Sequence, residues 1–262
     1  MNTYDNIATV YEKWSSGDAA YYSTARFYLL ALTQMKAGKY LELGIGTGRI
    51  SLEAVRHAPI SITGIDVSVQ MLSICKKKYE LLPFHYGTLE LYRGDMMCLP
   101  WNNVFHGAIM PFRTIGHFLT EESLDSLFEG VFRALKPGGW FLLDHYIFQR
   151  EWAETHDDVP ILMYKDNDLI ICDNYNYDFN NQMMHCKVMV NDSLFEEFDF
   201  RWLTQQQIRI SAMRAGFEVV SLMGEFDGTP WKEDSLEQIW LLRKPGNDES
   251  IVIPKLFPSE RT

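Results

Sequence analysis

The sequence predicts an α/β protein with a doubly wound, mostly parallel sheet that carries a C-terminal antiparallel strand. Three observations support this fold class. Between residues 36 and 145, short apolar or β-branched segments alternate with segments of helical period. A glycine turn, Gly44-Ile-Gly46-Thr-Gly48, joins the first of these strands to the first of these helices. The alternation resumes between residues 204 and 245. Short strands separated by amphipathic helices form a parallel sheet with right-handed crossovers.

The N-terminal segment is rich in aromatic side chains and is predicted to be helical. Ile7, Tyr11 and Trp14 occur at positions i, i+4 and i+7, which places them on one face of a helix. A second helix is expected from about Ala19 to Thr33. We expect residues 1–35 to form a helical lid over the ends of the strands.

Residues 36–145 and 204–245 form the predicted core. Lys136-Pro-Gly-Gly139 ends the last helix of the first part, because proline cannot continue a helix and glycine supplies the geometry of a helix C-cap. Thr204 begins the helix of the second part, and Gly216 ends it. The expected strands are Tyr40–Leu43, Ser61–Ile65, Leu89–Arg93, Gly107–Met110, Trp140–Asp144, Phe217–Leu222 and Gln238–Leu242, and the helices of the first part are Arg49–His57, Val69–Tyr79 and Leu124–Leu135.

Residues 146–203 interrupt this alternation and are predicted to form an inserted antiparallel cap. Two apolar and aromatic segments flank Asn180-Asn181, a pair that favours a tight turn between antiparallel strands. Ile161–Tyr164 and Leu194–Phe200 are further strand candidates. Residues 246–262 are expected to be a polar tail, and the 262 residues together are expected to form a single domain.

Composition excludes several classes of partner. The formal net charge of -11 argues against non-specific binding to nucleic acid or to an anionic membrane, since both need a basic surface.

The four cysteines are scattered without the spacing of metal ligands, which is typical of reduced cysteines in a cytosolic protein, and no metal site is expected. No apolar run approaches the ~20 residues of a membrane span, and the N-terminus lacks the features of a signal peptide. We therefore expect a soluble, cytoplasmic protein.

The candidate site lies where the parallel strands end, because open α/β sheets bind ligands outside the carboxyl ends of their strands. The glycine turn follows the first strand and aims backbone N–H groups at whatever binds there. Asp66 follows the second strand, about 20 residues after the turn, at a spacing suited to a ribose diol. Asp95 follows the third strand, where a second acid can accept a hydrogen bond from an amino group such as adenine N6.

Taken in order, four motifs of the chain resemble those of class I S-adenosylmethionine-dependent methyltransferases. They are Glu42-Leu-Gly-Ile-Gly-Thr-Gly48, Gly64-Ile-Asp66-Val-Ser68, Gly94-Asp95-Met96 and Leu135-Lys-Pro-Gly-Gly139. Ala215-Gly216-Phe217 fits the helix-to-strand step near the end of that family's domain. The resemblance covers roughly residues 36–145 and 204–245. It implies a Rossmann-like fold, S-adenosylmethionine as cofactor and transfer of its methyl group.

The resemblance also implies roles for individual residues at the cofactor. Glu42 and the turn Gly44–Gly48 would hold the methionyl part, and Asp66 would bind the ribose hydroxyls. The other expected contacts are Val67 and Met71 near the adenine, Asp95 at its N6, the Met96 backbone at a ring nitrogen, Met110 after the fourth strand, and Tyr11, whose ring favours a cation. Structural alternatives are a helix-capping Asp66, a turn residue at Asp95, a core Met71 and a Glu42 that binds local backbone amides.

Substrate and catalysis rest on fewer signals. Trp14, Tyr21 and Tyr22 are expected to line the substrate pocket, although a stripe at helical spacing is also typical of plain core. Arg113 is a candidate to bind a carboxylate or phosphate, with an acid-paired arginine as the alternative. His117 and His145, which follow the fourth and fifth strands, are candidates for a general base, and each is also consistent with a structural histidine.

These features favour a methyltransferase that acts on an oxygen or nitrogen nucleophile of a small molecule. Family members that methylate amino groups of nucleic acids often carry an Asn/Asp-Pro-Pro-aromatic run after strand four, where this chain has Met110-Pro-Phe-Arg113. One alternative keeps the cofactor but cyclises or cleaves its aminobutyl arm and releases methylthioadenosine. Another is a non-catalytic partner subunit that retains the cofactor site. The oligomeric state stays open.

Overall fold

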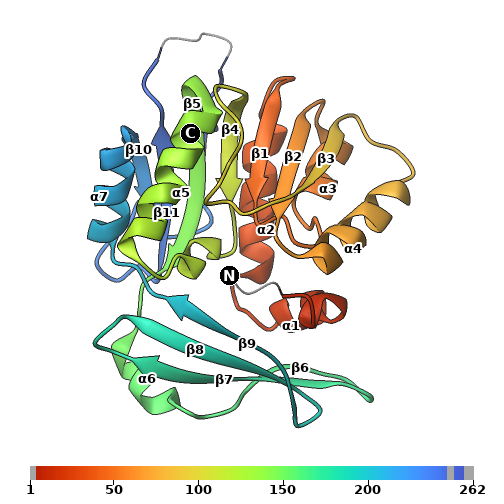
Figure 1. The fold of residues 1–262 in the computed structure, drawn as a ribbon, viewed down its shortest axis with the longest axis vertical. Helices are drawn as coiled ribbons and strands as arrows, with labels where there is room; N and C mark the ends of the chain where they lie inside the picture. The colour runs from red at the N-terminus through yellow and green to blue at the C-terminus, as the bar shows by residue number, and fades with distance from the viewer. Residues whose placement is uncertain (1–3, 247–250, 257–262) are drawn as a thin grey trace, which may run out of the picture.

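The computed structural model describes residues 4–246 and 251–256, and its centre is a seven-stranded sheet of order β10-β11-β5-β4-β1-β2-β3 (Figure 1). Strands β1 to β5 are parallel, and β11 runs antiparallel to both of its neighbours, β5 and β10. The predicted fold class is therefore confirmed. The strands are β1 Lys39–Leu43, β2 Ser61–Asp66, β3 Thr88–Arg93, β4 Phe105–Met110, β5 Leu135–Tyr146, β10 Glu218–Met223 and β11 Glu237–Arg243.

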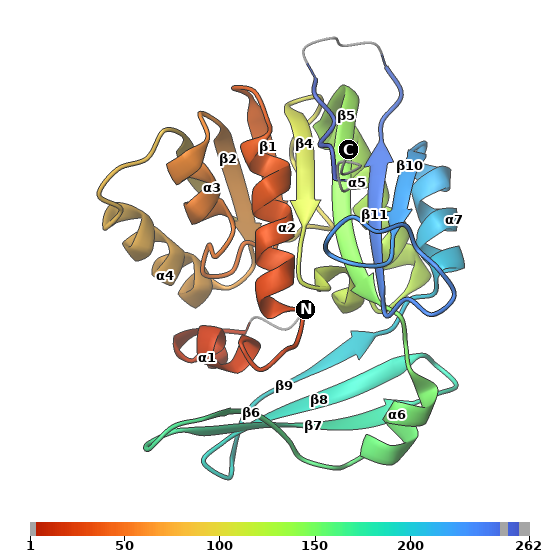
Figure 2. The same cartoon turned by 180° about the vertical axis from the view of Figure 1, so that it is seen from behind.

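Helices cover both faces of this sheet, so the central strands are buried on both sides (Figures 1 and 2). Helices α5 Glu121–Ala134 and α7 Gln205–Ala215 pack on one face, and α2 Tyr21–Thr33 and α3 Ser51–His57 pack on the other, with α4 Val69–Glu80 beside β3. Capping boxes at Thr120 and Thr204 begin α5 and α7, and Gly216 ends α7 in the left-handed region at φ 101°. The strand order reverses between β1 and β4, which is where such folds bind ligands.

Only the first part of the expected helical lid lies over the strand ends. Residues before α2 form a 3-10 turn, Ile7–Thr9, and the short helix α1, Tyr11–Ser15, both near the lower ends of the strands in Figure 1. Helix α2 instead packs on one face of the sheet and buries Phe27, Tyr28 and Leu32 there. The expectation that all of residues 1–35 form a lid is therefore wrong for α2. This helix belongs to the core because its apolar side chains pack against the sheet.

The insertion forms a second sheet below the first, as predicted (Figures 1 and 2). Its four antiparallel strands, in the order β6-β7-β8-β9, are called the cap here: β6 Ile161–Lys165, β7 Ile170–Asp178, β8 Met183–Val190 and β9 Ser193–Arg201. Asp178 accepts backbone N–H bonds from Asn180 and Asn181 and so stabilises the predicted turn. A short helix that was not predicted, α6 Arg150–His156, precedes the cap; it buries only Ala153, so its sequence carries little helical period.

Part of the expected tail packs on the core. The Lys255 backbone N–H donates to Gln34 on α2, and Leu256 is buried against the same helix. The rest of the expected tail, residues 247–250 and 257–262, lies outside the described residues, as do residues 1–3. Among the helices that the structure describes, none is both long and apolar enough to cross a membrane.

Candidate active site

A cavity of about 530 Å³ opens at the strand-order reversal, between the central sheet and the cap. This volume lies within the range of ligand pockets. Its wall includes the turns after β1, β2, β3 and β4, the N-terminal segment before α2, the end of β5 with the segment that follows it, the start of β11 and the inner face of the cap. The cavity therefore joins the predicted cofactor site to the predicted lid and cap.

The glycine turn requires glycine for two different reasons. Gly44, Gly46 and Gly48 have φ of 69°, 54° and 82°, in the left-handed region that other residues rarely adopt. A Cβ at Gly44 or Gly48 would also meet a neighbouring side chain, within 2.9 Å and 2.5 Å respectively. A Cβ at Gly46 would meet no atom within 4 Å, and Gly46 lines the cavity. Gly46 therefore leaves its space to the cavity, whereas Gly44 and Gly48 allow close packing.

Asp66 ends β2 on the cavity wall and connects the first two strand ends. Its Oδ2 accepts the Gly46 N–H at 2.8 Å, and its Oδ1 accepts the Ser68 N–H at 2.9 Å. Burial raises the pKa of the Asp66 carboxyl, while the backbone N–H groups of Ser68, Gly46 and Val67 lower it. The N-cap of α4 is Ser68, whose side chain accepts the Met71 N–H. Asp66 is therefore not the side-chain cap of this helix. A carboxylate has about four lone-pair sites, so Asp66 can still accept a hydrogen bond from a ligand.

The structure divides the expected cofactor residues into two groups. Glu42 is only 2% exposed, accepts a hydrogen bond from Ser51 Oγ, and has its pKa raised by burial to about 7. Asp95 accepts the Met97 N–H at 2.9 Å, which is the turn role given as its alternative. The cavity wall includes Tyr11, Gly44, Gly46, Asp66, Val67, Met71 and Met96, whereas Glu42, Gly48, Asp95 and Met110 are not among the residues that line it.

The N-terminal segment is anchored at both ends of the cavity. Glu12 accepts a hydrogen bond from Thr47 Oγ1 in the glycine turn at 2.8 Å. Trp14 Nε1 donates to Asp173 Oδ1 on the cap at 2.7 Å. Tyr11, the first residue of the same helix, lines the cavity, and burial raises the pKa of its phenol to about 12. The segment thus closes the cavity from the side.

The two candidate bases occupy different environments. His117 lines the cavity with Nε2 2.8 Å from Tyr4 Oη, and burial lowers its pKa to about 4. His145 is fully buried on β5, its Nε2 accepts the Leu203 N–H at 3.0 Å, and it is not among the lining residues. The structure therefore favours the structural alternative for His145, because its acceptor nitrogen already has a backbone partner.

Arg113 lies in a strained turn that a buried carboxylate holds. Phe112 and Arg113 have φ of 59° and 60°, and both of their N–H groups donate to Asp144 at 2.9 Å. The Arg113 guanidinium bonds Asp18 and, at 2.7 Å, Glu237. Arg113 is thus acid-paired, the alternative given above, and these carboxylates raise its pKa. It still lines the cavity.

Tyr21 and Tyr22 do not line the cavity, contrary to the prediction. Tyr22 is 75% exposed, and the Tyr21 ring lies under the guanidinium of Arg49, 4.1 Å from its centroid. Both belong to the first turn of α2, and neither is among the buried residues of that helix. Trp14, the third predicted aromatic, is on the wall.

Several wall residues were missed by the sequence analysis. Glu237 begins β11, and because that strand is antiparallel its first residue lies at the same edge as the ends of the parallel strands. Glu237 could have been found from the sequence, because the sequence predicts that the last strand is antiparallel. Asp173 accepts hydrogen bonds from Trp14 and, at 2.6 Å, from Tyr175 Oη. The cap side also contributes Tyr146, Phe148, Trp152, Met163, Tyr177, Met184, Phe198 and Phe200.

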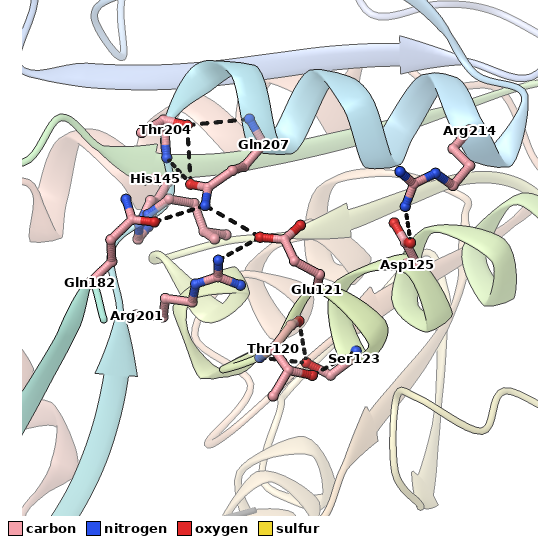
Figure 3. A network of polar contacts seen from close by, with 11 residues as sticks. Thr120, Glu121, Ser123, Asp125, His145, Gln182, Arg201, Thr204, Gln207 and Arg214 are labelled. Atoms are coloured by element: carbon pink, nitrogen blue, oxygen red, sulfur yellow. Dashed lines mark hydrogen bonds and ion pairs between the residues drawn. The ribbon is translucent and has the colours of Figure 1, made fainter. Parts of the chain in front are cut away.

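A polar network fixes the cap to the core beside the cavity (Figure 3). Arg201, the last residue of β9, donates to Glu121 at the start of α5 at 2.5 Å. Gln207 on α7 donates to Glu121 at 3.3 Å and to Gln182 in the β7–β8 turn at 2.8 Å. Three core and cap elements therefore meet at one carboxylate.

Comparison with known proteins agrees with this geometry. Residues 41–139 match the methyltransferase domain family. A cypemycin N-terminal methyltransferase from a Streptomyces species is 27% identical over 209 residues, which are 78% of this chain and 82% of that protein. The chain spans about half the length of other curated methyltransferases that it matches.

Solved structures share the fold at low identity. The CcbJ methyltransferase from Streptomyces caelestis aligns with a TM-score of 0.76 over 94% of this chain and 99% of its own, at 19% identity. S-adenosylmethionine-bound CalS10, an amino pentose methyltransferase from Micromonospora echinaspora, aligns with a TM-score of 0.61 over 90% and 96%, at 17% identity. The chain is therefore a methyltransferase built on a Rossmann-like sheet. The family match, the relatives and the solved structures together support a class I S-adenosylmethionine-dependent methyltransferase, with S-adenosylmethionine as cofactor.

Proposed function

We propose that the protein transfers the methyl group of S-adenosylmethionine to an oxygen or nitrogen nucleophile of a small molecule. One observation carries this proposal: a single cavity has Gly46 and Asp66 at one end and the aromatic inner face of the cap at the other. A cofactor at the first end and an acceptor at the second would share one enclosed volume. Two structurally similar proteins are named as an amino pentose methyltransferase and a sugar N-methyltransferase, which supports a small acceptor.

The wall residues fit the cofactor. Asp66 has lone pairs free to accept bonds from ribose hydroxyls. Val67, Met71 and Met96 supply an apolar surface of the kind that an adenine ring contacts, and the open side of Gly46 leaves room for the aminobutyl arm. Tyr11 provides an aromatic ring of the kind that favours a sulfonium cation. Four of the expected cofactor residues do not line the cavity and would act by stabilising the turns and strands around it: Glu42, Gly48, Asp95 and Met110.

The residues of the chain act mainly by positioning. The cofactor supplies a methyl group on a positively charged sulfur, which keeps the bonding electrons when the methyl group leaves. Holding two reactants in line lowers a barrier by about 7–11 kcal/mol in favourable cases. The pKa of His117 is lowered to about 4, so its ring is neutral at pH 7. Its hydrogen bond to Tyr4 holds the Tyr4 side chain in place on the wall of the cavity.

The first test is cofactor binding. Calorimetric titration of the protein with S-adenosylhomocysteine should show one site per chain, and Asp66→Ala should weaken it by about tenfold or more, as expected for lost hydrogen bonds to a carboxylate. Asp234→Ala, an exposed acid on the loop before β11, is the matched control and should leave the affinity unchanged. Absence of binding, or equal affinity for Asp66→Ala, would contradict the proposal.

The second test identifies the product. Incubation with S-adenosylmethionine and a panel of small acceptors, followed by mass spectrometry, should yield S-adenosylhomocysteine. Release of methylthioadenosine instead would show that the aminobutyl arm reacts. Turnover by the purified chain alone would exclude a purely supporting role in a complex.

A further inference from the structure

The acceptor end of the cavity carries more negative than positive charge. Asp18, Asp173 and Glu237 contribute carboxyl groups to the wall, in addition to Asp66 at the cofactor end. Within the part of the chain that the structure describes, Arg113 is the sole lysine or arginine on that wall. Arg113 pairs with Asp18 and Glu237, so one guanidinium serves two carboxylates.

Two of these carboxyl groups lack a full complement of charged partners. Glu237 is 8% exposed; its Oε1 bonds Arg113, and its Oε2 has no hydrogen-bond partner among the described residues. Asp173 is fully buried, and the donors to it among the described residues, Trp14 Nε1 and Tyr175 Oη, are both uncharged. Burial raises the pKa of Asp173 to about 6 and that of Glu237 to about 7. Buried carboxylates with too little opposing charge show this direction of shift, and a bound cation would reverse it.

Aromatic rings surround the same space. Tyr175 and Tyr177 extend from β7, Phe198 from β9 and Tyr146 from the end of β5, and all line the cavity with Trp14. The electron-rich faces of such rings attract a cation, and more strongly when the cation is removed from water. The wall therefore combines unpaired negative charge with aromatic surface, which is the chemistry that binds a substituted ammonium ion.

We propose that the acceptor is an amine that enters as an ammonium ion and is held by Asp173 and Glu237, with its apolar part against the aromatic residues of the cap. This inference rests on the proposed function and narrows its nucleophile from oxygen or nitrogen to nitrogen. An ammonium ion has no lone pair, so the nitrogen gives one proton to a carboxylate of the cavity before it accepts the methyl group.

Matched amine and alcohol probes test the inference on the protein saturated with S-adenosylhomocysteine. Phenethylamine and 2-phenylethanol form one pair, and tryptamine and tryptophol form another. Calorimetry should show at least about tenfold tighter binding of each amine than of its alcohol, the ratio expected for one charge-assisted hydrogen bond. Equal or tighter binding of the alcohols, or no binding of either amine at millimolar concentration, would overturn the inference.

Charge-removing variants locate the effect. Asp173→Asn and Glu237→Gln should each weaken amine binding about ten- to a hundredfold and leave affinity for S-adenosylhomocysteine within about twofold. Glu218→Gln, at an exposed position on β10, is the matched control and should change neither. Retained cofactor affinity also verifies that a variant is folded, and the wild-type comparison of amine with alcohol stands without the variants.

The two proposals fail in distinguishable ways. If the wild-type protein does not bind S-adenosylhomocysteine, the proposed function fails. If it binds S-adenosylhomocysteine but shows no preference for amines, or if neither acidic variant weakens amine binding, only the inference about the acceptor fails.

Discussion

His145→Gln separates a structural from a catalytic histidine. In the folded protein the His145 ring is fully buried and its Nε2 accepts the Leu203 N–H at 3.0 Å. Glutamine keeps an acceptor oxygen on the side chain but cannot be protonated near neutral pH. The variant therefore removes the titration of this residue and preserves its means of binding the backbone.

The magnitude follows from the pKa of the buried ring. Burial lowers the pKa of His145 from 6.5 to about 3. As the pH falls below 6.5, the unfolded chain binds a proton at this residue that the folded protein does not bind. The free energy of unfolding then falls by about 1.36 kcal/mol per pH unit until the folded pKa is reached. Between pH 6.5 and pH 5 the loss from His145 is about 2 kcal/mol.

Other buried groups also titrate in this range, so the variant must be compared with the wild type. His117, with its pKa lowered to about 4, acts with the same sign as His145. Glu42, Asp173 and Glu237 have raised pKa values and act with the opposite sign, because they bind protons in the folded state before they do so in the unfolded chain. These contributions are common to both proteins and cancel in the difference.

Urea unfolding followed by tryptophan fluorescence at pH 6.5 and pH 5 measures this difference. The wild type should lose about 2 kcal/mol more than His145→Gln over that interval. His57→Gln, whose side chain is 53% exposed, is the control and should follow the wild type. Identical pH dependence in all three proteins would refute the argument from burial. A loss of methyl transfer by about a hundredfold at pH 7, with stability intact, would instead show that His145 acts on the substrate.

Three further substitutions probe the turn, the surface and the cap junction. Gly44→Ala should destabilise the protein more than Gly46→Ala in urea unfolding, because both incur about 1–2 kcal/mol of left-handed strain but only the first meets a side chain at 2.9 Å; equal losses would contradict the packing argument. Tyr22→Ala should change stability by less than about 0.5 kcal/mol and leave the KM for the acceptor unaltered, and a raised KM would return this residue to the pocket. Arg201→Ala should lower the free energy of unfolding by about 1–2 kcal/mol. The loss should exceed that of Arg214→Ala, because the Arg214 side chain is 56% exposed and that of Arg201 only 9%. A larger loss for Arg214→Ala would show that the contact between cap and core contributes little to stability.

The sequence predicted the core because its signals are local. Each strand carries its own apolar or β-branched run, and Gly44, Gly46 and Gly48 occupy positive φ as the turn requires. The acid at the end of β2 could be placed on the cavity wall because its position depends only on the end of its own strand. Such features need no knowledge of distant contacts.

The acceptor end could not be predicted in the same way because it is made by distant contacts. Asp173 and Trp14 are far apart in the sequence and meet only after the cap has folded over the N-terminal segment. The pattern of aromatic residues in α2 fits a lid as well as a core helix, and only packing on the sheet decided that Tyr22 faces solvent. His145 follows a strand of the core, but its partner, Leu203, is supplied by the end of the insertion.

That last contact has a consequence for how the protein can be modified. The chain leaves the core after Tyr146 and returns at Leu203, and the hydrogen bond from Leu203 to His145 brings the two points together. Since the core itself holds the ends of the insertion side by side, a replacement segment would start and end at fixed points, and it would need to keep the contacts to Trp14 and Glu121. Its length changes cost little closure entropy, about 0.6 kcal/mol for each doubling of a flexible loop. Grafting the corresponding segment from another methyltransferase between these two points would exchange the part of the acceptor wall that the cap supplies and leave the cofactor wall in place.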